Sequence, residues 1–137
     1  PVGLFQLNPN RMFVKYRFII WDADMPYAMF FNWIHGGRLS GVAIHSSGKS
    51  HAAMLGKRAS AGCIRLGPKQ AQELFGSIQE HYQGSVPRFV MNRKTRTMSR
   101  DGEISHDKSG KIRLTDGFRV LVMVEDYGGE DTVISML

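Results

Sequence analysis

The residues most able to do chemistry in this chain lie in the motif Ser60-Ala-Gly-Cys-Ile-Arg65, which holds the only cysteine among 137 residues. A single thiol cannot form an internal disulfide. Eighteen residues upstream, His45 ends the short apolar run Gly41-Val-Ala-Ile-His45, which is typical of a strand with a polar tip. A cysteine and a histidine on separate elements are the minimum for nucleophilic catalysis by a thiol.

The neighbours of this pair fit the same chemistry. A free thiol has a pKa of about 8.5, so a nearby imidazole is needed to make it an efficient nucleophile at neutral pH. The amides of Gly62 and Cys63 are candidates for an oxyanion hole, a feature worth about 3 kcal/mol per donor in acyl transfer. Arg65 suits a substrate carboxylate, which a guanidinium binds through two parallel hydrogen bonds. A structural role, in which Arg65 pins the loop to nearby carbonyls, is an equal alternative.

Strands are expected on both sides of the histidine. Apolar residues alternate over residues 12–20, which predicts a half-buried strand, and Asn8-Pro9-Asn10 before it is typical of a turn. The apolar runs 28–34 and 41–45, with Gly36-Gly37 between them, predict a hairpin. Further strands are predicted at 87–91 and 118–124, with a shorter hairpin around Asp101-Gly102.

One helix is expected directly after the cysteine motif. Gly67-Pro68 opens it, because proline is well placed at a first helical position, and Gly84 is a suitable stop. Its predicted core-facing side consists of Ala71, Leu74, Phe75, Ile78 and Tyr82. The stretch 46–60, rich in small residues, is predicted to be a loop, and loops on a rigid scaffold often carry active-site groups.

Composition predicts a single folded domain over residues 1–137. Hydrophobic residues make up 42% of the chain and charged residues 22%, which is ordinary for a globular protein. No apolar run approaches the ~20 residues of a membrane span, so no transmembrane segment is predicted. Cysteine and histidine lack metal-ligand spacing, and neither a metal nor another cofactor is expected. The net charge of +6 points to an anionic partner or to solubility alone, and no motif predicts specific nucleic-acid binding.

These residues resemble the catalytic domain of the L,D-transpeptidases (YkuD-type), which remodel bacterial peptidoglycan. The matching text is Ile44-His45 and then Ser60-x-Gly-Cys-Ile-Arg-Leu66, followed by the helix. The resemblance is strongest over residues 1–91 and leaves 92–137 as C-terminal strands or an extension. It implies a mainly β fold, a β-sandwich or barrel with one principal α-helix after the catalytic cysteine.

Three positions depart from the family's pattern. Pro1-Val-Gly-Leu-Phe5 resembles the latter part of a Thr-Pro-x-Gly-x-Phe segment that normally follows one or two strands. Those strands are not found in this sequence, so we expect either that the chain is trimmed there or that other residues, such as those of the basic C-terminal third, complete the sheet. Ala61 stands where many members have a second histidine. Ser46 replaces a glycine that often follows the first histidine, and its main-chain carbonyl is expected to orient the imidazole.

The resemblance implies a cysteine acyltransferase of the cell wall. The Cys63 thiolate would attack the carbonyl of the third stem-peptide residue, release D-alanine and leave a thioester. Transfer to another stem would give a 3→3 cross-link, transfer to a lipoprotein would anchor it, and water would give trimming. The implied catalytic residues are Cys63, His45, Ser46 and Gly62, and the expected substrate-binding residues are Arg65, Ser60, His51 and Tyr27. The implied location is the periplasm or the extracellular cell envelope, and carbapenems become expected inhibitors.

Three alternatives remain open at this point. A lone cysteine is often an inert buried residue that packs as a small hydrophobe. A thiol L,D-carboxypeptidase or amidase would use the same Cys63 and His45 with water as the acceptor. A non-catalytic module that binds the cell wall would need neither side chain, so its binding would survive the substitution Cys63→Ala.

Overall fold

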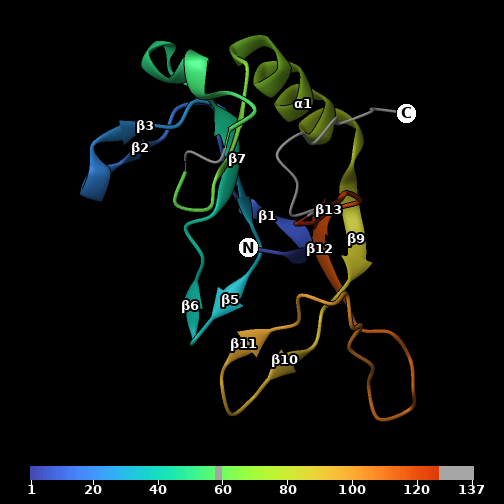
Figure 1. The fold of residues 1–137 in the computed structure, drawn as a ribbon. Coiled ribbons are helices and arrows are strands. Elements are labelled where there is room, and N and C mark those ends of the chain that lie inside the picture. The colour runs from blue at the N-terminus through green and yellow to red at the C-terminus, as the bar shows by residue number, and fades with distance from the viewer. Residues whose placement is uncertain (58–59, 127–137) are drawn as a thin grey trace.

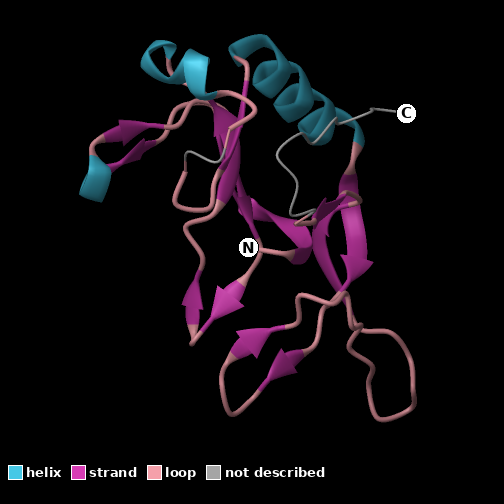
Figure 2. Ribbon diagram, in the orientation of Figure 1, coloured by secondary structure: helices cyan, strands magenta, loops and turns pink. Residues whose placement is uncertain are grey.

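The computed structural model of this protein describes residues 1–57 and 60–126, with the backbone alone described at positions 21 and 49–51. The described part is mainly β, with a curled five-stranded sheet and one α-helix (Figures 1 and 2). The order of strands in the sheet is β13-β1-β4-β7-β8. The predicted fold class, a mainly β domain with a principal helix after the cysteine, is confirmed.

The elements are as follows. The main sheet contains β1 (Gly3–Phe13), β4 (Ala28–Phe31), β7 (Ala43–Ser46), β8 (Ile64–Leu66) and β13 (Leu121–Val124). The two-stranded ribbons pair β2 (Arg17–Phe18) with β3 (Ala23–Asp24), β5 (Ile34–His35) with β6 (Arg38–Leu39), β9 (Gln83–Pro87) with β12 (Leu114–Phe118), and β10 (Met91–Asn92) with β11 (Thr97–Met98). The helices are α1 (Pro68–His81) and the short 3-10 helices η1 (Ile19–Trp21) and η2 (Lys49–Met54).

The C-terminal part of the chain supplies a strand beside the first one. β13 pairs antiparallel with β1, in a register that runs from Gly3 opposite Val124 to Gln6 opposite Leu121. On its other side β1 pairs with β4. Residues of the C-terminal third therefore extend the sheet next to β1.

The predicted turn at Asn8-Pro9-Asn10 and the strand predicted over 12–20 are wrong. The first strand, β1, already begins at Gly3 and ends at Phe13, and the turn-like residues lie inside it. Its pairing with β4 shifts register between Leu7 and Met12, and the Asn10 backbone N–H donates to Asn8 Oδ1 at 3.0 Å. Residues with turn propensity thus form an irregularity within a paired strand, a position that tolerates proline.

The hairpin predicted from the runs 28–34 and 41–45 is confirmed, with an addition. β4 and β7 pair antiparallel, with Met29 opposite Ile44. Between them the chain forms a second, smaller hairpin, β5–β6, whose turn is made by Gly36 and Gly37 at φ 58° and 78°. Only glycine adopts such angles without steric cost, so the predicted glycine break is the tip of this smaller hairpin.

The later strands differ from the prediction. The strand predicted at 87–91 is wrong, because β9 ends at Pro87 and β10 begins only at Met91. The run 118–124 is divided, since Phe118 ends β12 and Leu121 begins β13. The shorter hairpin is β10–β11, so its turn lies at residues 93–96 and not at 101–102.

Helix α1 begins at Pro68 as predicted and ends at His81. Its buried residues are Ala71, Phe75 and Ile78, whereas Leu74 and Tyr82 are 37% and 42% exposed. The predicted stop is wrong, because Gly84 lies in β9. The loop predicted for 46–60 is also only partly loop, since η2 occupies its first half.

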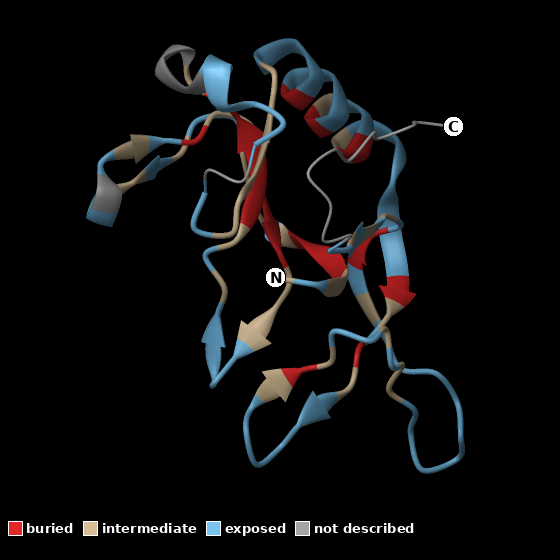
Figure 3. Ribbon diagram, in the orientation of Figure 1, coloured by how far each residue is buried: buried red, intermediate tan, exposed pale blue. Residues whose placement is uncertain are grey.

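The central strands bury side chains on both faces (Figure 3). The larger cluster faces α1 and contains Phe5, Leu7, Met29, Phe31, Ile44, Phe75, Ile78 and Phe118. A smaller cluster contains Met25, Ala28, Phe30 and Ala43, and Cys63 packs against it. Because neighbouring residues of a strand point to opposite faces, the cysteine lies on the face of the sheet opposite α1.

Candidate active site

The parallel pair β7–β8 brings the histidine and the cysteine motif together. His45 lies opposite Arg65 in the register, and Ile44 lies opposite Ile64. Both isoleucines contribute to the core cluster that faces α1. The period of two along each strand therefore places His45 and Arg65 on the other face, and Cys63 directly precedes β8 on that same face.

A pocket of about 170 Å³ contains these groups. It is lined by His45, Cys63, Arg65, Ser60, Ala61, Gly41, Phe18, Ala23 and Met25. The last three belong to the β2–β3 ribbon and to the residue that follows it, so this ribbon forms an apolar wall opposite the motif. The sequence did not predict this wall, because the alternation over residues 12–20 favours one continuous strand. The signal for a ribbon was the pair of apolar residues Phe18 and Met25 on either side of Asp22.

The imidazole of His45 is held by the backbone of the next residue. Nδ1 of His45 lies 2.8 Å from the carbonyl oxygen of Ser46, and the residue is 7% exposed. A carbonyl only accepts hydrogen bonds, so Nδ1 carries a proton and Nε2 is the basic nitrogen of the neutral ring. This is the main-chain contact expected of Ser46. The strand end itself is fixed, because the Ser46 amide donates to the Pro26 carbonyl at 2.8 Å.

The thiol of Cys63 is half-buried, in surroundings that favour its protonated form. Burial raises the pKa of the Cys63 thiol, while the Ala43 backbone N–H and the Arg65 charge lower it by smaller amounts. Its Sγ–H donates to the Gly41 carbonyl at 3.7 Å. Because the environment favours the neutral form, the thiol needs a base in order to react quickly near neutral pH.

Ser60 cross-links the backbone of the cysteine motif. Its hydroxyl donates to the Cys63 carbonyl at 2.5 Å and accepts from the Gly62 amide at 3.2 Å. Gly62 has a φ of 119°, a conformation that side chains with a Cβ rarely adopt. The serine and the glycine together therefore fix the turn that presents the thiol to the pocket.

Comparison with known proteins agrees with this geometry. The model of the L,D-transpeptidase catalytic domain family (YkuD) matches residues 1–119. The chain belongs to this family. The match extends past residues 1–91, where the motifs lie, and covers α1 and both strands of the β9–β12 ribbon. No curated protein and no solved structure matches the chain. Family membership supports an L,D-transpeptidase activity and a role connected with peptidoglycan.

Of the two other residues expected at the L,D-transpeptidase site, only the Tyr27 side chain is described. Tyr27 packs against α1, with its ring 5.8 Å from the Phe75 ring in an edge-to-face arrangement, and it does not line the cysteine pocket. It belongs instead to the periphery of the larger core cluster. His51 lies on η2, and its side chain is outside the described part of the chain.

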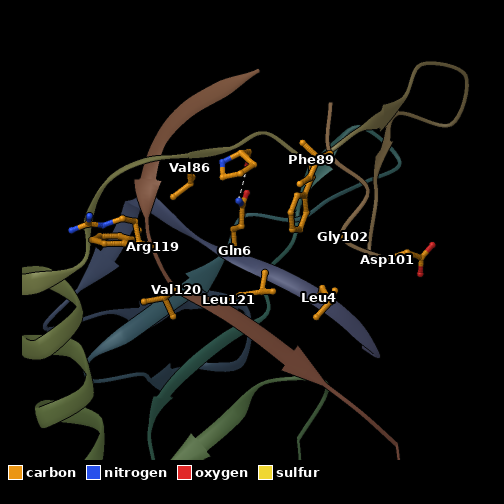
Figure 4. Close-up of a pocket in the computed structure, with 12 residues that line it drawn as sticks. Leu4, Gln6, Val86, Phe89, Asp101, Gly102, Arg119, Val120 and Leu121 are labelled. Atoms are coloured by element: carbon orange, nitrogen blue, oxygen red, sulfur yellow. Dashed lines mark hydrogen bonds between the residues drawn. The ribbon is translucent and has the colours of Figure 1, made fainter. Parts of the chain in front are cut away.

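A larger groove of about 340 Å³ lies elsewhere on the domain, beside β1, β9, β12 and β13 (Figure 4). Its lining is mostly apolar and includes Leu4, Val86, Phe89 and Leu121. The Gln6 amide group at its floor donates to the Pro87 carbonyl at 2.7 Å. The groove contains neither the cysteine nor a histidine, so the nucleophile lies in the smaller of the two cavities.

Within residues 1–57 and 60–126, no group of three or more His, Cys, Asp or Glu side chains is arranged to hold a metal ion. No helix in the same part of the chain is long and apolar enough to cross a membrane.

Proposed function

We propose that this chain is a peptidoglycan L,D-transpeptidase of the periplasm or the extracellular cell envelope, with Cys63 as the nucleophile and His45 as its base. One observation carries the proposal. The single thiol of the chain and a histidine whose Nδ1 is fixed by a carbonyl line the same pocket in a domain of this family. A buried inert cysteine would not need an oriented imidazole beside it.

The first half-reaction forms a thioester. His45 Nε2 takes the Cys63 proton, and the thiolate attacks the carbonyl carbon of the third residue of a stem tetrapeptide. The C–S bond forms and the C–N bond to the terminal D-alanine breaks. The imidazolium returns the proton to the leaving amine, so D-alanine departs with its amine neutral and His45 is again a base.

The oxyanion of this step needs backbone donors. The Gly62 amide already donates to Ser60, which leaves the Cys63 amide as the donor we assign to the developing negative charge. Removal of one such donor typically costs a factor of about 10²–10³ in rate. Arg65 lines the same pocket and offers a guanidinium for the carboxylate of the departing D-alanine.

The second half-reaction resolves the thioester. An amine of a second stem attacks the thioester carbon, Cys63 leaves as thiolate, and the proton of the attacking amine passes through His45 to the sulfur. The product is a 3→3 cross-link. A lipoprotein amine would give an anchored protein by the same step, and water would give a trimmed tripeptide.

Intact-protein mass spectrometry tests the donor reaction. The protein is incubated with a disaccharide tetrapeptide and, separately, with a carbapenem, and the mass of the protein and free D-alanine are measured. We expect an acyl adduct from each compound and D-alanine release from the tetrapeptide. Cys63→Ala removes both adducts. His45→Ala slows them, whereas His106→Ala, an exposed histidine outside the pocket, leaves them unchanged.

The acceptor arm separates transferase from hydrolase. With an excess of a second stem tetrapeptide, a dimeric product carrying a 3→3 link is expected. Tripeptide alone would assign the carboxypeptidase reaction to the same Cys63 and His45. A folded protein that forms no adduct with either compound would overturn the catalytic assignment and favour a module that only binds the wall.

A further inference from the structure

Two small hairpins lie side by side at the end of the molecule away from α1 (Figure 1). They are β5–β6 and β10–β11, and contacts join β5 to β11. Residues 34–39 and 91–100, which contain them, hold five of the chain's 18 Lys and Arg residues and none of its 12 Asp and Glu residues. The five cations form what we call the basic hairpin face: Arg38, Arg93, Lys94, Arg96 and Arg100.

The five cations are exposed and lack anionic partners. All five side chains lie in the exposed class, and among the described residues none of them is within ion-pair distance of a carboxylate. Ion pairs do occur between other described residues, on the β2–β3 ribbon and on α1. Like charges that are held together without counterions repel one another, so this arrangement opposes folding and favours a negatively charged partner.

Hydrogen bonds fix how the two hairpins sit against each other. The Gly37 amide donates to the Arg96 carbonyl at 3.1 Å, and the Gly36 amide donates to Thr97 Oγ1 at 3.4 Å. Within the β10–β11 turn, Asn92 Oδ1 accepts from the amides of Lys94 and Thr95 at 2.9 and 3.1 Å. The backbone that carries these cations is therefore ordered before any partner binds, which lowers the entropy cost of binding.

The side chains of two of the arginines contact neighbouring residues. A Cβ atom built on Gly37 would lie 2.7 Å from Cζ of Arg96, so the guanidinium of Arg96 passes directly over the glycine. Arg100 stacks on Trp33, with its Cζ 5.6 Å from the ring centroid. Trp33 is only partly exposed, and Arg100, Phe5 and His35 all lie beside its ring, which leaves it poorly placed for stacking by a nucleic-acid base.

We propose that the basic hairpin face binds a linear phosphate-bearing polymer. Four of the five cations are arginines, whose planar guanidinium matches the oxygens of a phosphate group in two parallel hydrogen bonds. Several exposed cations on two adjoining hairpins fit a polymer with repeated phosphates better than a single small anion. This binding uses no residue of the cysteine pocket, so it stands independently of the acyl-transfer chemistry.

The basic hairpin face lies close in the chain to the wall of the cysteine pocket. Arg38 lies three residues before Gly41, whose carbonyl accepts the hydrogen bond from the Cys63 thiol and which lines the pocket. The chain thus leads directly from the basic hairpin face into the wall of the pocket. A polymer held there keeps the enzyme on an anionic matrix while the cysteine remains accessible.

Binding of linear polyphosphate, measured by fluorescence anisotropy over a range of salt concentrations, tests the proposal. The variant Arg38→Gln/Arg93→Gln/Lys94→Gln removes three charges from the face and keeps Arg96, whose backbone is part of the turn. The matched control Lys15→Gln/Lys57→Gln/Lys69→Gln removes three charges from exposed positions elsewhere. We expect the face variant to bind at least about tenfold more weakly, and the slope of log K against log salt to fall by about 2, because each charge contributes about 0.7. The control should change affinity by less than about twofold.

Three results would overturn the proposal. The first is no binding of polyphosphate by the parent protein at about 50 mM salt, where counterion release is strongly favourable. The second is equal weakening in both triple variants, which would assign binding to net charge alone. The third is tighter binding of duplex DNA or of anionic phospholipid vesicles than of polyphosphate through the same residues. Formation of the Cys63 adduct by the face variant is measured in parallel and should match the parent, so this test and that of the acyl transfer fail separately.

Discussion

The two faces of strand β7 differ in what they do, although the residues that define them are neighbours in the chain. Ile44 points toward α1 and belongs to a closed apolar cluster with Phe75 and Ile78. His45 points to the other face and lines a half-open pocket with Cys63. Because neighbouring residues of a strand point to opposite faces, Ile44 contributes to the core and the next residue, His45, faces the pocket.

The two faces also differ in the size of their buried side chains. On the face toward α1, β4 and β7 bury large side chains such as Met29, Phe31 and Ile44. On the opposite face, the fully buried positions next to Cys63 include Ala28 and Ala43. Small residues on that face leave space, and the β2–β3 ribbon surrounds this space with Phe18 and Met25 to give the pocket. The comparison suggests that substitutions on one face should change rate and those on the other should change stability.

The largest effect is expected from His45→Ala, which should lower the reaction rate of Cys63 and leave stability nearly unchanged. Loss of a general base typically costs a factor of about 10²–10⁴ in rate. We expect the rate of carbapenem adduct formation to fall within that range, while the midpoint of thermal unfolding shifts by only a few degrees. Stopped-flow or quenched mass spectrometry gives the rate. A fall in the unfolding midpoint as large as that of a core variant would mean that His45 acts mainly in packing.

Phe75→Ala tests the opposite face. Phe75 is 9% exposed on α1 and contacts Tyr27, so its removal leaves a cavity in the larger cluster. Such truncations cost about 3–5 kcal/mol of unfolding free energy. Denaturant unfolding should show this loss, and the remaining folded fraction should react with carbapenem at a rate close to that of the parent. A specific loss of rate in the folded protein would contradict the division between the two faces.

Ser60→Ala tests whether the Ser60 hydroxyl positions the turn that carries Cys63. The substitution removes the hydroxyl that joins the Cys63 carbonyl to the Gly62 amide. A net hydrogen bond contributes about 1 kcal/mol, so a decrease of roughly fivefold in adduct rate is expected with little change in unfolding midpoint. Ser60→Thr keeps the hydroxyl and should restore most of the rate. If alanine and threonine behave alike, Ser60 does not position the turn.

The smallest effect is expected from Arg65→Gln, which should shift the pH dependence of Cys63 alkylation. Burial raises the pKa of the Cys63 thiol and the Arg65 charge lowers it by a smaller amount, so removal of that charge should raise this pKa further. Because a raised thiol pKa favours the protonated form in the fold, the contribution of Cys63 to stability is present at low pH and is lost as the pH rises through that pKa. The rate of iodoacetamide alkylation against pH measures the midpoint. A lower midpoint in Arg65→Gln would reverse the sign assigned here.

Local signals predicted the elements whose partners are near in sequence. Pro68 marked the start of α1, because its fixed φ and missing N–H suit the first helical turn. The paired apolar runs predicted the β4–β7 hairpin, and Gly36-Gly37 predicted a turn. At the N-terminus the same kind of signal failed, since Pro9 and its neighbours lie inside β1. Pairing with β13, more than a hundred residues away, and with β4 outweighs local turn propensity there.

The amino-acid sequence by itself determined which groups we propose to react, one thiol and the histidine 18 residues before it, because residue type and spacing are local properties. Only the tertiary structure decided what surrounds them. The apolar wall made by the β2–β3 ribbon, the position of Tyr27 on the core side, and the meeting of the two basic hairpins all depend on contacts between segments that are distant in sequence. Such contacts are set by packing of the whole chain, and no window of sequence contains the two partners at once.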